Sequence, residues 1–146
     1  MPWRALVALC GVVLLTSCAS MVGASVPQAP TPAPVTAALG ESFTLAAGQT
    51  AHVGAERMGI TFEAVVSDSR CPTDVQCIRA GEAVVRAVAK AQGQTAETVE
   101  LQTTPSRAQV LVAGYTLTLT GVSPAPNTTV RVKASDYRAT FTLAKP

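Results

Sequence analysis

Cys71 and Cys77 are the two residues of this chain whose type and spacing most clearly suggest chemistry. Such a pair can form a disulfide bond, act as a redox couple or help to bind a metal. Redox couples usually have the C-x-x-C spacing, and a structural zinc needs four nitrogen or sulfur ligands, whereas the sequence holds a single histidine, His52. We therefore predict a disulfide between Cys71 and Cys77, whose small ring would contribute about 2–2.5 kcal/mol to stability.

The segment enclosed by these cysteines has two interpretations. A proline fixes one φ angle and the disulfide would close the loop, so little conformational entropy remains to be lost on binding. The functional interpretation is a preorganised recognition loop that presents Thr73, Asp74 and Gln76. The structural interpretation, which we favour, is a covalent staple between two core strands, with Asp68 and Arg70 tying the loop by hydrogen bonds.

The remaining polar residues form no recognisable catalytic arrangement. Catalysis needs a nucleophile beside a base, paired carboxylates or a metal cage. His52 lies on a predicted strand, where a surface or hydrogen-bonded histidine is the ordinary interpretation. Asp68 and Asp74 could bind a cation through oxygen, but two carboxylates without a spaced series of ligands are weak evidence. We predict no enzymatic activity, no cofactor and no metal site, and the lack of a nucleic-acid-binding module predicts no nucleic-acid partner.

The N-terminal segment, residues 1–17, indicates a location. It contains one positive charge, an apolar run about half as long as the ~20 residues of a membrane span, and Leu-Thr-Ser immediately before Cys18. This pattern is typical of bacterial lipoprotein signal peptides, so we predict that Cys18 becomes the lipidated first residue, carrying acyl chains such as palmitate. An ordinary signal peptide cleaved elsewhere, for example after Ala24, is the alternative. Export also places the other cysteines in an oxidising compartment.

Similarity to lipoproteins of Gram-negative bacteria adds a detail about the membrane. Ala19 follows the lipidated cysteine, at the position where an aspartate would favour retention in the inner membrane. The similarity therefore implies a lipid anchor in the outer membrane, with the protein facing the periplasm.

Composition divides the rest of the chain into a tether and one domain. Residues 18–38 carry no charge and contain four closely spaced prolines, which favour extended backbone and disfavour a folded strand. We interpret them as a semi-rigid tether, with a proline-rich ligand for another domain as the alternative. Residues 39–146 have the size of a single domain. The net charge is +2, and falls to +1 without Arg4, which argues against a basic or acidic binding protein.

The domain is predicted to be all-β. Period-2 alternation is clearest in residues 60–67, 115–120 and 137–143, where one face is apolar and the other is rich in threonine. Turn residues separate further candidates, so seven or eight strands predict an antiparallel β-sandwich or small barrel. Residues 83–91 also permit a helix, but their valines and flanking glycines favour a strand. The weaker strand candidates are residues 42–46, 50–54, 82–91, 95–102 and 108–112.

Two segments resemble those of a family of small secreted or lipid-anchored bacterial proteins of uncharacterised activity. The first runs from Asp68 to Ala83 and contains DSRCP, VQC and AGEA, and the second contains VSPAP at residues 122–126 followed by DYRA at 136–139. The resemblance would span most of residues 42–143. Those relatives often carry an aromatic residue where this chain has Arg79. The resemblance implies a fold and a location, but no activity.

These observations together predict a membrane-anchored protein of the bacterial cell envelope with a structural or binding role. The membrane would be contacted through the lipid on Cys18, and an envelope protein is the expected partner. The alternative is a periplasmic inhibitor of a lysozyme-type or protease-type enzyme, which would use the disulfide loop as a wedge.

Overall fold

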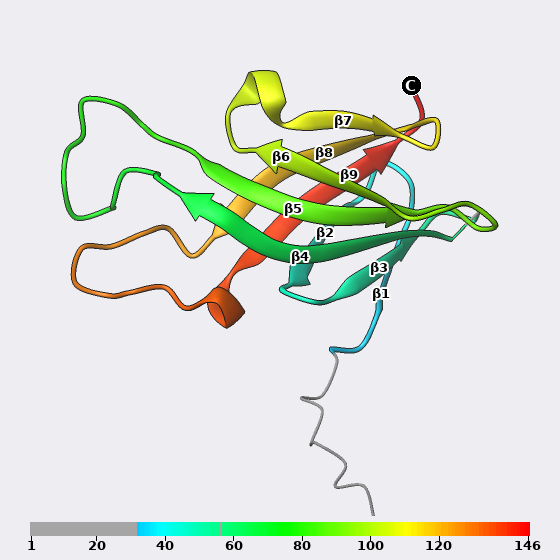
Figure 1. The fold of residues 1–146 in the computed structure, drawn as a ribbon, viewed down its shortest axis with the longest axis horizontal. Coiled ribbons are helices and arrows are strands. Elements are labelled where there is room, and N and C mark those ends of the chain that lie inside the picture. Colours follow the sequence, from blue (N-terminus) through cyan, green and yellow to red (C-terminus); the bar gives the residue numbers. More distant parts are fainter. Residues whose placement is uncertain (1–31, 56) are drawn as a thin grey trace, which may run out of the picture.

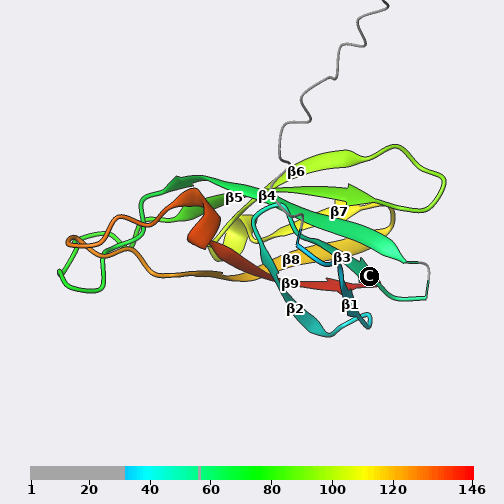
Figure 2. The ribbon, with the colours of Figure 1, turned by 90° about the horizontal axis from the view of Figure 1, so that it is seen from below.

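The computed structural model describes residues 32–55 and 57–146, so the predictions for Cys18 and the signal peptide lie outside the described residues. Two β-sheets pack face to face in a sandwich (Figures 1 and 2). The five-stranded sheet has the order β1-β3-β4-β5-β6, and the four-stranded sheet has the order β2-β9-β8-β7. The described part of the chain thus confirms the all-β prediction and shows a sandwich of two separate sheets.

The strands follow the predicted alternation closely. Every second side chain is buried along β5 and in the first half of β4, which is the pattern of strands with one face on a core. Residues 83–90 form a strand and not a helix. The strands are β1 (Val35–Ala37), β2 (Ser42–Ala46), β3 (Thr50–Val53), β4 (Met58–Asp68), β5 (Ala83–Lys90), β6 (Glu97–Gln102), β7 (Gln109–Val112), β8 (Tyr115–Ser123) and β9 (Arg138–Ala144).

Strand β1 corrects the sequence analysis, which expected no strand in residues 18–38. Val35–Ala37 pairs in parallel with β3, and its Val35 and Ala37 side chains pack against the core. The strand begins directly after Pro34 and occupies the sheet edge, where a preceding proline costs no ladder hydrogen bond. The folded domain therefore begins a few residues earlier than predicted.

The predicted turns join the strands, and their glycines adopt the positive φ angles that these turns require. Gln92-Gly93-Gln94 connects β5 to β6, and Ala113-Gly114 connects β7 to β8. Gly93 and Gly114 adopt φ angles of 75° and 79°, which side chains disfavour. Two short 3₁₀ helices, Pro105–Arg107 and Ala134–Asp136, complete the secondary structure of the described residues. No helix in this part of the chain is long and apolar enough to cross a bilayer.

The core between the sheets is apolar. Among the described residues, every fully buried side chain is hydrophobic. Phe141 of β9 lies at its centre, with its ring centroid 6.0 Å from that of Phe43 on β2 and 6.4 Å from that of Phe62 on β4. Phe141 thereby packs against both sheets. The connecting loops project from the ends of this sandwich.

Candidate recognition site at the loop tip

The disulfide loop is held by an extension of the β4–β5 hairpin. Beyond the strand ends, Ser69 N–H donates to the Glu82 carbonyl at 2.8 Å, and Cys71 N–H donates to the Ala80 carbonyl at 2.8 Å. The loop therefore projects from the end of the sandwich on a paired neck (Figure 1). Gly81 belongs to this neck because its φ is +66° and a Cβ there would collide with the Ser69 carbonyl oxygen.

The predicted disulfide is confirmed. Cys71 and Cys77 are bonded, with their Cα atoms 5.9 Å apart. Inside the ring, Val75 N–H donates to the Pro72 carbonyl at 3.4 Å, which closes a turn. The disulfide and this turn fix the loop backbone locally.

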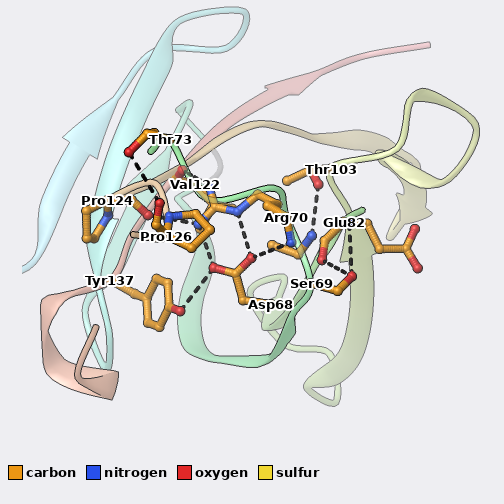
Figure 3. Close-up of polar contacts among 11 residues, drawn as sticks. Asp68, Ser69, Arg70, Thr73, Glu82, Thr103, Val122, Pro124, Pro126 and Tyr137 are labelled. Atoms are coloured by element: carbon orange, nitrogen blue, oxygen red, sulfur yellow. Dashed lines mark hydrogen bonds and ion pairs between the residues drawn. The ribbon is translucent and has the colours of Figure 1, made fainter. Parts of the chain in front are cut away.

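Arg70 then ties the loop to the opposite sheet. Its guanidinium donates to both Asp68 carboxylate oxygens at 2.8 and 2.7 Å, to the Val122 carbonyl at 2.5 Å and to the Pro124 carbonyl at 2.8 Å (Figure 3). The Tyr137 hydroxyl donates to Asp68 at 3.0 Å. We name Asp68, Arg70 and Tyr137 the clamp. It closes one end of the sandwich, and it confirms the predicted Asp68–Arg70 pair.

The clamp is largely shielded from solvent, which shifts the pKa values of its groups. The side chains of Arg70 and Asp68 are only 17% and 8% exposed. Burial acts to raise the pKa of the Asp68 carboxyl, but the hydrogen bonds and charge of Arg70 and the Tyr137 hydroxyl outweigh it, so the pKa is lowered. Burial and the hydrogen bond to Asp68 raise the pKa of Tyr137. The ionised pair is therefore the form that the fold stabilises.

A second loop, residues 124–137, lies beside the disulfide loop at the same end of the molecule, as both ribbon views show (Figures 1 and 2). Thr73 N–H donates to the Pro126 carbonyl at 3.0 Å. The Asp74 carboxylate accepts from Thr128 N–H at 3.0 Å and also from the Thr128 hydroxyl. We name residues 71–80 and 124–133 together the tip.

The three predicted recognition residues are all exposed. Thr73 and Asp74 also hydrogen-bond to the second loop. The hydroxyl and backbone hydrogen bonds of Thr128 lower the pKa of Asp74. Asp68 and Asp74 are separate and are each hydrogen-bonded to protein groups, and the described residues contain no group of three or more metal-ligating side chains.

The tip also exposes apolar side chains that the sequence analysis did not single out. Ile78 is 104% exposed, Val130 is 65% exposed and Val75 is 47% exposed. The sequence did carry one signal for this exposure: Ile78 is an apolar residue in a turn-rich segment and does not belong to an alternating strand pattern. Three basic residues, Arg79, Arg131 and Lys133, are also exposed on the two loops. The tip therefore exposes both apolar and basic side chains on two loops that are hydrogen-bonded to each other.

His52 lies away from the tip. It is a half-buried residue on β3, opposite Gly59 of β4.

Comparison of the chain with protein-family models, curated proteins and solved structures finds no match.

Proposed function

We propose that the chain is a lipoprotein of the bacterial envelope whose domain binds a protein partner through the tip. The observation that carries this proposal is the full exposure of Ile78 on a loop that a disulfide and several hydrogen bonds hold in place. An ordered loop loses little entropy on binding. Large apolar side chains on such a loop gain free energy when a partner covers them.

The shape and charge of the tip define the expected partner. Loops that project from the end of the sandwich can enter a cleft, and the exposed Arg79, Arg131 and Lys133 favour a cleft with acidic margins. We therefore propose an envelope protein with an apolar cleft bordered by carboxylates. The tip would act as a binding surface and not as a catalytic site.

The test compares tip variants with a matched surface variant. Ile78→Ser and Val130→Ser remove apolar side chains from the tip, and Leu111→Ser removes one that is 64% exposed on β7. All three proteins are used as bait on detergent-solubilised envelopes. A partner that Leu111→Ser retains and both tip variants lose supports the proposal. Equal capture by all three variants contradicts it.

Inhibition of a lysozyme-type or protease-type enzyme is the second candidate function. A disulfide loop that projects from the end of a rigid sandwich is suited to enter an active-site cleft. Gln76→Ala is the sharper variant here, because Asp74→Ala would also break the hydrogen bonds that join the disulfide loop to Thr128 of the second loop. This candidate predicts weaker inhibition at an unchanged melting temperature, and an unaltered inhibition constant for both Gln76→Ala and Ile78→Ser would exclude it.

The anchor is a separate part of the proposal. We expect Cys18→Ser to move the protein from the membrane fraction to the soluble fraction, because the acyl chains supply the hydrophobic free energy of attachment. Fractionation followed by immunoblotting measures this. A Cys18→Ser protein that stays with outer membranes would show that another element holds it there.

A further inference from the structure

The outer face of the five-stranded sheet carries a hollow of about 480 Å³, at the end of β4 and β5 opposite to the tip. Strands β3, β4 and β5 line it, together with Arg57 from the β3–β4 turn and the start of the β5–β6 turn. Its volume lies within the range of small-molecule sites. The hollow is thus separate from the surface proposed to bind a protein.

Strand register explains why the sheet is hollow at this point. His52 lies opposite Gly59, and Gly59 lies opposite Lys90, so the three residues form one row across three strands. The middle residue of the row has no side chain. His52 and Lys90 therefore border a gap whose floor is Gly59 and its neighbours Thr61 and Val88.

The border of the hollow is basic. His52, Arg57 and Lys90 all line it, while none of its lining residues in the described part of the chain is Asp or Glu. Guanidinium and ammonium groups bind carboxylates and phosphates through charge-assisted hydrogen bonds. The border therefore favours an anionic group.

The floor favours an apolar group. The hydroxyls of Thr50 and Thr61 hydrogen-bond to each other at 2.8 Å, and Val88 lies beside them.

We propose that this hollow binds an amphiphilic organic anion. Its phosphate or carboxylate head would lie among His52, Arg57 and Lys90, and its apolar part would lie over the floor against Thr61 and Val88. The same chemistry is available from a free amphiphile and from an anionic lipid.

The test titrates the full domain with octyl phosphate below its critical micelle concentration, followed by calorimetry. Inorganic phosphate and octyl glucoside supply the head and the tail separately, and each should bind at least tenfold more weakly. Lys90→Ala should weaken octyl phosphate binding about tenfold, because a charge-assisted hydrogen bond is lost. Gly59→Val should abolish binding by filling the floor, and a β-branched residue suits a strand with ordinary φ.

Matched controls separate the hollow from general effects. Gly121→Val places the same side chain in β8, and Arg107→Ala removes one charge from the 3₁₀ helix between β6 and β7; both should bind like the parent. Vesicles of phosphatidylcholine with phosphatidylglycerol distinguish a free amphiphile from an anionic lipid. Gly59→Val should release the domain from these vesicles only if the ligand is a lipid. Absence of octyl phosphate binding, or equal binding by the parent, Lys90→Ala and Gly59→Val, would overturn the proposal.

Discussion

At the scale of single residues, Arg70 joins parts of the chain that are distant in sequence. One guanidinium joins Asp68 at the end of β4 to two carbonyls that follow in sequence by more than fifty residues. A planar group with five fixed donors can satisfy such a set of acceptors, whereas a lysine ammonium cannot. The clamp therefore depends on arginine and not only on positive charge.

Replacing Arg70 tests this dependence. We expect Arg70→Met to lower the free energy of unfolding by about 2–4 kcal/mol, because it leaves the shielded Asp68 carboxylate without its counter-charge. Urea denaturation measures the loss. Adding Asp68→Asn to Arg70→Met should recover part of it, and strictly additive effects of the two substitutions would contradict a direct coupling.

Asp68 also predicts an acid dependence. Its pKa is lower in the folded state than in the unfolded chain, so its contribution to stability is present above the unfolded pKa of about 4 and is lost as the pH falls through the folded pKa. Asp68→Asn should therefore be less stable than the parent at neutral pH, and the difference should shrink below about pH 4. The measurement is urea denaturation across this range, with the exposed Glu97→Gln as control. A difference that stays constant down to the lowest pH would contradict the assignment.

At the scale of elements, the disulfide loop and its neck form a unit that the chain stabilises in two ways. The bond restricts the unfolded chain, and the hydrogen bonds of Ser69, Cys71 and Thr73 hold the folded loop. We expect Cys71→Ser combined with Cys77→Ser to lower the free energy of unfolding by about 2 kcal/mol. Denaturant midpoints measure this, and reduction of the parent protein should give the same shift. Equal midpoints for variant and parent would refute a stabilising staple.

The elements that sequence analysis predicted are those with local signals. Strand β2 has the predicted bounds because its alternation and its flanking turn are encoded in adjacent residues. Strand β1 was missed because it has only three residues. It is stabilised by parallel pairing with β3, which its own residues do not indicate. Propensity alone cannot reveal such a pairing.

The same distinction applies to the candidate site. The Asp68–Arg70 pair and the disulfide join residues that are close in sequence, and both were predicted. The bond from Asp74 to Thr128 joins residues 54 positions apart, so nothing near Asp74 indicated that its carboxylate was already used. The exposure of Ile78 likewise depends on how the two loops meet.

At the scale of the whole molecule, the two sheets share one apolar core. Phe141 is fully buried and contacts aromatic residues of both sheets. We expect Phe141→Ala to lower the free energy of unfolding by about 3–5 kcal/mol, because it removes a large side chain and leaves a cavity. Far-ultraviolet circular dichroism and the near-ultraviolet signal of the tyrosines should follow one transition. Separate transitions in the parent would show that the sheets unfold independently.

The parallel edge strand has a mechanical consequence. Tension that reaches the domain from its N-terminal side is applied first to Ala33, which the Gln49 side chain holds, and then to Val35 of β1. β1 has only three residues, although Gly54 N–H and the Gln49 amide add hydrogen bonds to the Ala37 and Ala33 carbonyls. It should therefore detach under load before the antiparallel strands yield. Its release would lengthen the segment that precedes the domain by roughly 10 Å and leave the core strands paired. Detachment of β1 would therefore take up an extension before the core is loaded.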